Sequence, residues 1–174
     1  MADAVFKLLK CVGELAANQE DCSKHPSFLS TNATTNLTAT YPVSIPSEGA
    51  ANNFSYETWL RLQCTTSPSN AVTNIRFYGA NSTVAASVEI FAGATPTPST
   101  PISSTLSSIA ASLQHIYFYN SDPNYLSITA STASGEITAV GSLSNYLVLQ
   151  LKTYPSAGRG NSGILSFNVT YDES

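Results

Sequence analysis

The chain has 174 residues, of which 43% are apolar and only 10% are charged, and its formal net charge is −4. This length suits one domain with a real hydrophobic core and a modest extension. The seven Lys and Arg residues are scattered, which argues against a phosphate-binding surface and so against nucleic-acid binding. No stretch approaches 18 consecutive apolar residues, so no membrane-spanning helix is predicted.

Neutral polar residues take the place of the missing charges. Charged residues usually make up about a quarter of a globular protein, and here Ser, Thr and Asn replace them. Such a surface repels other copies weakly and packs well against neighbours, which is a first indication of an assembly protein. Three cysteines (Cys11, Cys22 and Cys64) form an odd set without disulfide-scaffold spacing, which is typical of synthesis in a reducing compartment.

Residues 3–17 carry the pattern of an amphipathic α-helix. Its apolar residues recur at i, i+3, i+4 and i+7, and Asp3 is a suitable N-cap. One such helix is not stable alone, so we expect it to dock on the main body or on another chain. The interface candidates in this segment are Val5, Leu8, Leu9, Val12 and Leu15. Residues 18–40 are polar and unpatterned, so residues 1–40 are predicted to form a helix and an extended arm.

The main domain is predicted to span residues 41–174, because strand-like segments separated by turn residues run from about residue 37 onward. Several alternate cleanly between apolar and polar positions. The candidate strands cover residues 38–45, 54–64, 73–79, 87–93, 115–120, 124–130, 135–143, 146–154 and 163–173. The predicted fold is therefore mainly β, an antiparallel β-sandwich or jelly-roll-like domain of eight to nine strands, with the N-terminal helix and arm attached.

The interval 93–114 breaks this rhythm. Pro96, Pro98 and Pro101 cannot donate to a sheet ladder, so its first half is predicted to be a stiffened loop. Its second half fits a short helix across one end of the sandwich, with Leu106, Ile109, Ala110 and Leu113 on one side. Such a loop either carries function or bridges the two sheets.

The segment FSYETWLRLQC (54–64) holds the only Trp of the chain. Alternation places Trp59 on the same strand face as Glu57 and Arg61, opposite an apolar face. Trp59 could stack on a sugar, lie in a protein interface or belong to the core. The low charge favours a Trp59 covered by protein, either by the chain's own arm and helix or by a partner subunit, so Trp59, Glu57 and Arg61 join the interface candidates.

Residues able to do chemistry are few. His115 begins a predicted strand beside tyrosines and fits the edge of an aromatic face. A zinc site could be drawn from Cys11, Cys22, Cys64 and His25, but structural zinc sites use two tight ligand pairs. Neither a G-x-S-x-G nucleophile motif nor a phosphate-binding loop is present, and the acids Glu57, Glu89, Asp122 and Glu136 lie in different elements. We therefore predict no enzymatic activity, no cofactor and no metal.

The order of segments from residue 54 to the end is similar to that of small virion structural proteins of tailed bacteriophages. The similarity lies in SYETWLRLQC followed by NIRFYG, VEIFAG, a Thr/Pro stretch and the final YLVLQLKTYPSAGRGNSGILSFNVTYDE. Within that group the chain resembles capsid decoration (cement) proteins. Residues 1–40 lie outside the resemblance, and the family has no catalytic residues to carry over.

The resemblance implies a mechanical role. A decoration protein would be made in the host cytoplasm, sit on the phage head and clamp the major capsid protein or other virion proteins. A homo-oligomer is implied, with a trimer favoured. Within the same class the alternative is a neck, tail or fibre-attachment protein, and from another class it is a carbohydrate-binding (lectin-like) module that would bind glycans.

Overall fold

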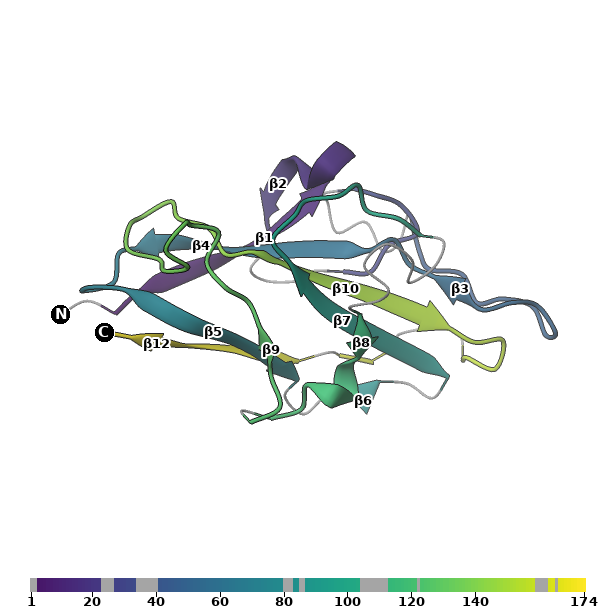
Figure 1. The fold of residues 1–174 in the computed structure, drawn as a ribbon. Helices are drawn as coiled ribbons and strands as arrows, with labels where there is room; N and C mark the ends of the chain where they lie inside the picture. Colours follow the sequence, from purple (N-terminus) through teal and green to yellow (C-terminus); the bar gives the residue numbers. More distant parts are fainter. Residues whose placement is uncertain are drawn as a thin grey trace.

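The computed structural model describes residues 3–22, 27–33, 41–79, 83–84, 87–103, 113–121, 123–158, 163–164 and 166–174. Within these residues the chain is mainly β, and its paired strands are antiparallel. The largest sheet has the strand order β2 (Asn18–Asp21), β1 (Val5–Val12), β4 (Thr58–Thr66), β10 (Tyr146–Thr153), β7 (Val88–Thr95) and β8 (Gln114–His115). A short seventh strand, β3 (Asn53–Phe54), also pairs with β10 (Figure 1).

A smaller sheet packs against one face of the large sheet. It contains β12 (Phe167–Glu173), β5 (Val72–Gly79) and β9 (Leu126–Ser127), in that order. A separate pair joins β11 (Gly163–Ile164) to β6 (Thr83–Val84). Single 3₁₀ turns follow β1 (η1, Glu14–Ala16) and β8 (η2, Ile116–Phe118). Among the described residues, none lies in a helix that is long and apolar enough to cross a membrane.

The main core lies between the two sheets, as in a β-sandwich. Alternation in β4 and β10 turns one set of leucines to this side, where they meet residues of β5. The buried members from these three strands include Leu60, Leu62, Leu147, Leu149, Leu151, Val72, Ile75 and Phe77. Each fully buried side chain of this size stabilises the fold by roughly 1.5–3 kcal/mol relative to an exposed one, so this core is the main source of stability.

The two ends of the described chain meet beside this core. The Ala4 amide donates to Oε2 of Glu173 at 3.0 Å, and the Tyr171 hydroxyl donates to the Ala4 carbonyl at 2.7 Å. The Phe6 and Tyr171 rings stand edge to face at 5.2 Å. Figure 1 shows both ends on the same side of the molecule, next to β1, β5 and β12. The N-terminal strand thus links the large sheet to the small one.

The predicted N-terminal helix is wrong, because residues 5–12 form β1. This strand pairs with β4 from Val5 to Cys11 and with β2 from Leu9 to Val12. Residues 9–12 are all buried, since neighbouring parts of the chain cover both faces of β1 here. A strand buried on both faces loses its alternation, and its apolar run then matches helical spacing by coincidence. The segment belongs to the large sheet.

Most of the predicted strands are confirmed, but several are shorter than expected. Segments 73–79, 87–93 and 146–154 correspond to β5, β7 and β10, and 163–173 to β11 and β12. Segment 54–64 becomes β3 and β4, interrupted at residues 55–57, and 124–130 contains only β9. Segment 115–120 passes into η2 after His115, 135–143 makes only isolated bridges, and 41–45 is not a strand. Residues 38–40 and the predicted short helix around Leu106 and Ile109 lie outside the described residues.

Candidate functional site

The candidate site lies on the face of the large sheet that turns away from the small sheet, called here the outer face. Register places Trp59 of β4 beside Cys11 of β1 and Val148 of β10 on this face. These residues form a second buried cluster, completed by Ala16, Leu113, Tyr146 and the partly buried Phe91. The outer face is therefore a smaller core of its own, covered by the chain itself.

Trp59 is the centre of this cluster and is 0% exposed. Its ring packs edge to face against Tyr146, with centroids 5.3 Å apart. The guanidinium of Arg61 stacks over the Tyr146 ring, 4.3 Å from its centroid. Arg61 also donates from Nε to the Ser144 carbonyl at 2.8 Å and from Nη1 to the Tyr146 hydroxyl at 3.2 Å. Stacking and hydrogen bonds together make the buried position of a cation tolerable.

Glu57 lies on the other side of Trp59 and is also buried. Its Oε2 accepts the indole hydrogen of Trp59 at 2.9 Å and the amide hydrogen of Ile102 at 3.3 Å. The Glu57 amide donates to the Ile102 carbonyl at 2.8 Å, so the two residues are bonded in both directions. Burial raises the pKa of the Glu57 carboxyl, although the hydrogen bonds from Trp59 and Ile102 partly oppose this rise.

Two segments without regular structure are fastened to this part of the sheet. The first is residues 27–33, where the Leu29 carbonyl accepts the Tyr56 amide at 2.9 Å and the Leu29 side chain is 1% exposed. The second is residues 97–103, called here the strap, which Ile102 bonds to Glu57. Thr100 of the strap also accepts the Leu15 amide at 3.0 Å through its Oγ1. The irregular residues 55–57 thus present backbone groups to both segments.

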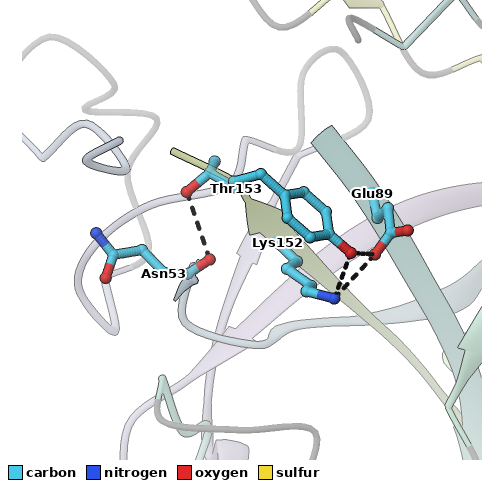
Figure 2. Close-up of polar contacts among 5 residues, drawn as sticks. Asn53, Glu89, Lys152 and Thr153 are labelled. Carbon is cyan, nitrogen blue, oxygen red and sulfur yellow. Dashed lines mark hydrogen bonds and ion pairs between the residues drawn. The ribbon is translucent and has the colours of Figure 1, made fainter. Parts of the chain in front are cut away.

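A polar cluster occupies the far end of the outer face and is partly open to solvent. Lys152 of β10 and Glu89 of β7 are directly paired in the sheet and form an ion pair at 3.1 Å. Figure 2 shows their charged ends pointing toward each other, while Thr153 turns to the backbone of Asn53. The Tyr154 hydroxyl donates to Glu89 at 2.6 Å and accepts a hydrogen bond from Lys152.

The titration of this cluster favours the ion pair. Burial acts against both charges, but the hydrogen bonds with Tyr154 and between the pair outweigh it. These bonds hold the pKa of Glu89 below the ordinary Glu value and the pKa of Lys152 above the ordinary Lys value. A lowered carboxyl pKa makes a weaker base, and a raised amine pKa makes a less available nucleophile. The cluster is therefore suited to joining β7 to β10.

The structure brings together only some of the predicted interface candidates. Glu57, Trp59 and Arg61 share the outer face as predicted, and Leu9 joins them because it pairs with Arg61. Val5 is the first residue of β1 and Leu15 lies in η1, beyond the other end of that strand; their side chains are 50% and 56% exposed. The remaining candidates are the partly buried Leu8 and the buried Val12. Their part in an interface stays a prediction.

Cysteines and histidines do not converge. Cys11 lies in the outer-face cluster, whereas Cys22 and Cys64 belong to the main core, on the other side of the sheet. All three are free thiols, and burial raises the pKa of Cys11 to about 12 and that of Cys22 to about 11. His115 stands edge-on to Phe91 at 5.5 Å, and His25 lies outside the described residues. Across the described part of the chain, no group of three His, Cys, Asp or Glu residues could hold a metal ion.

Sequence reasoning missed the contacts made across strands. Alternation placed Tyr146, Val148, Gln150 and Lys152 on one face of β10, and the structure agrees. It could not show that Tyr146 meets Trp59 and Arg61, because that depends on the register between β4 and β10. The docking position of the strap was also not predicted, because no pattern in a Thr/Pro stretch indicates which part of the sheet it will contact.

Comparisons of the chain with protein-family models, with curated proteins and with solved structures found no match.

Proposed function

We propose that this chain is a non-enzymatic structural protein of a tailed-phage virion, and most specifically a capsid decoration protein. It binds the head shell and stabilises it through contacts with the major capsid protein, as a homo-oligomer for which a trimer is favoured. The sequence resemblance of residues 54–174 is one support. We also propose that the sandwich is of the jelly-roll type.

The observation that carries the proposal is how the chain uses its few charges. It has seven Lys and Arg and eleven Asp and Glu residues. Among those that the structure describes, Lys10, Glu57 and Arg61 are buried. Four more are tied up in the ion pairs of Lys152 with Glu89 and of Arg76 with Asp172. Exposed charges are what keep soluble proteins apart, so this surface resists close packing against neighbours only weakly.

Large apolar side chains stand on this charge-poor surface and offer contact points. Leu15, Phe118 and Val140 are each more than half exposed. Val5, Tyr41 and Tyr125 add further exposed apolar area. Aromatic and aliphatic anchors surrounded by neutral polar residues are typical of subunit interfaces. The outer face contributes indirectly, because Trp59 and Arg61 are buried within the chain and fix the sheet that carries these anchors.

The test is direct binding to a shell. Purified protein is mixed with expanded phage heads assembled without it, and the amount that sediments with the heads is measured against free protein. The proposal predicts saturable binding with a fixed number of copies per head and an increase in the temperature at which the heads break. Light scattering of the free protein gives its oligomeric state.

Two further measurements separate the alternatives. Binding to purified tails or necks, but not to heads, would move the chain to the neck, tail or fibre-attachment class. Binding to a glycan array without binding to any virion part would overturn the proposal in favour of a lectin-like module. A Leu15→Asp variant tests one of the exposed anchors. It should fold like the natural chain but bind heads more weakly.

A further inference from the structure

Two buried oxygen atoms on the outer face lack a hydrogen-bond partner among the described residues. They are Oε1 of Glu57 and Oε1 of Gln150. Glu57 is 3% exposed and Gln150 is 0% exposed. Both atoms are acceptors when Glu57 is ionised, and a buried acceptor without a donor is unfavourable. Two such atoms, in side chains that both bond to Ile102, require an explanation.

The register of β10 brings the stretch that holds Glu57 alongside Gln150. Leu149 pairs with Thr58 of β4 and Lys152 pairs with Phe54 of β3, so the three irregular residues 55–57 lie opposite Gln150 and Leu151. Both side chains also converge on the strap. The Ile102 carbonyl accepts the Glu57 amide at 2.8 Å and Nε2 of Gln150 at 3.5 Å. Nε2 of Gln150 also donates to the Ser55 carbonyl at 2.9 Å, which fixes the orientation of its amide.

One hydrogen atom would satisfy both acceptors. We propose that Glu57 carries a proton on Oε1 and donates it to Oε1 of Gln150, forming a carboxyl–amide lock that fastens the strap (residues 97–103) over the outer face, and that loss of this proton releases the strap. Oε2 of Glu57 remains the acceptor for Trp59 and Ile102. The lock is therefore closed at low pH and open at high pH.

The charged groups around Glu57 do not replace this proton. On the same face, Arg61 is engaged with Ser144 and Tyr146, and Lys152 is engaged with Glu89 and Tyr154. The other titratable groups facing the site are Cys11 on β1, His115 on β8, and Tyr56, which follows Ser55. Residues 27–47 and 93–114, which include both covering segments, contain no Asp, Glu, Lys, Arg or His. The carboxyl group thus meets a neutral cover, and burial favours its protonated form.

Deprotonation would act on the strap at Ile102, whose amide donates to the Glu57 carboxyl group. An ionised Glu57 places a charge against the carbonyl oxygen of Gln150 in a site closed to water, which is unfavourable. Moving Ile102 away opens the site, hydrates the carboxylate and exposes Trp59. Two other bonds to the strap do not titrate: the Glu57 amide donates to the Ile102 carbonyl, and the Leu15 amide donates to the Thr100 hydroxyl.

The single Trp of the chain is a reporter at the lock itself. The experiment measures the emission maximum and acrylamide quenching of Trp59 in the full chain from about pH 4 to about pH 9, below the ordinary tyrosine pKa. The expected result is a transition to redder, more easily quenched emission, with a midpoint above 4.5, the ordinary Glu value. Glu57→Gln, whose amide donates to Gln150 at every pH, should abolish the transition. Glu48→Gln, an exposed substitution, should keep it.

Two further measurements keep the proposal testable if a variant folds poorly. Gln150→Met removes the acceptor and should move the midpoint down toward the ordinary value. Urea unfolding should show that Glu57→Gln gains stability relative to the natural chain as the pH rises from 4.5 to the midpoint, and that the gain is constant above it. The same fluorescence profile in the natural chain and in Glu57→Gln would overturn the proposal. So would a midpoint at or below 4.5, or one that Gln150→Met leaves unchanged.

Discussion

Trp59 donates its indole hydrogen to Glu57 at 2.9 Å, from a position two residues further along the same face. Both side chains are buried, so each supplies the hydrogen bond that the other needs in the absence of water. On the other side, Arg61 turns to Tyr146 and not to Glu57. The acid and the base that border the single Trp in the sequence therefore do not pair with each other. Glu57 bonds to Trp59 itself, whereas Arg61 holds Tyr146, which packs against Trp59.

The first prediction concerns this hydrogen bond. Trp59→Phe removes the hydrogen-bond donor to the buried Oε2 of Glu57 and leaves a cavity against Tyr146. We expect the free energy of unfolding to fall by about 2–4 kcal/mol, measured by urea unfolding followed by circular dichroism. Phe118→Leu, at a side chain that is 66% exposed, is the control and should change it by less than about 0.5 kcal/mol. Equal effects of the two substitutions would contradict the burial of Trp59.

The sequence was sufficient to predict the strands with clean alternation and their buried faces. In β10 the three leucines face the main core, and the residues that alternate with them face the outer side, so local pattern and tertiary position agree. It was not sufficient for β1, because a strand covered on both faces shows no alternation. Nor could it show that Gln150 and Glu57 both bond to Ile102, since that depends on how distant segments align.

The second prediction tests β1 as part of the sheet. Deleting residues 1–21 removes β1 and β2, exposes the edge of β4 and takes Phe6 and Leu8 from the core. We expect the truncated chain to lose cooperative unfolding and most of its β signal in circular dichroism. A chain lacking only residues 2 and 3 is the control and should unfold like the full chain. A truncated chain that still unfolds cooperatively would show that the N-terminal segment is a dispensable arm.

The third prediction concerns pH. The pKa of Glu89 is lowered in the folded state, so its contribution is present above the ordinary value of 4.5 and is lost as the pH falls through the lowered pKa. The pKa of Lys152 is raised, so its contribution is present below 10.5 and is lost as the pH rises through the raised value. At neutral pH we expect Glu89→Gln to cost about 0.5–1 kcal/mol, because the pair is partly exposed to solvent.

The measurement for this pair is urea unfolding of both chains at about pH 3 and about pH 7. The difference between them should shrink at the lower pH and in high salt, which screens the ion pair. Glu48→Gln should show neither dependence, since Glu48 is exposed at a turn. A difference that does not vary with pH would mean that the Tyr154 hydrogen bond, and not the charge, carries the effect.

The fourth prediction separates stability from assembly at Leu15. The turn that follows β1 has Leu15 and Ala16 at φ of 51°, in the left-handed region, and the Ala17 amide closes it onto the Glu14 carbonyl at 3.2 Å. Asn tolerates this conformation far better than Leu, and Leu15 has little packing to lose because its side chain is 56% exposed. We expect Leu15→Asn to raise the free energy of unfolding by about 0.5–1 kcal/mol.

The same substitution should weaken binding to expanded heads, because it removes an exposed apolar anchor. The control is Val140→Asn, at a side chain that is 61% exposed and whose φ is not positive. It should give no gain in stability. A more stable Leu15→Asn chain that sediments with heads as well as the natural chain would remove Leu15 from the interface, and the strained leucine would then need another explanation. Strain kept at an exposed apolar residue is typical of a site selected for contact, so we expect stability and binding to change in opposite directions.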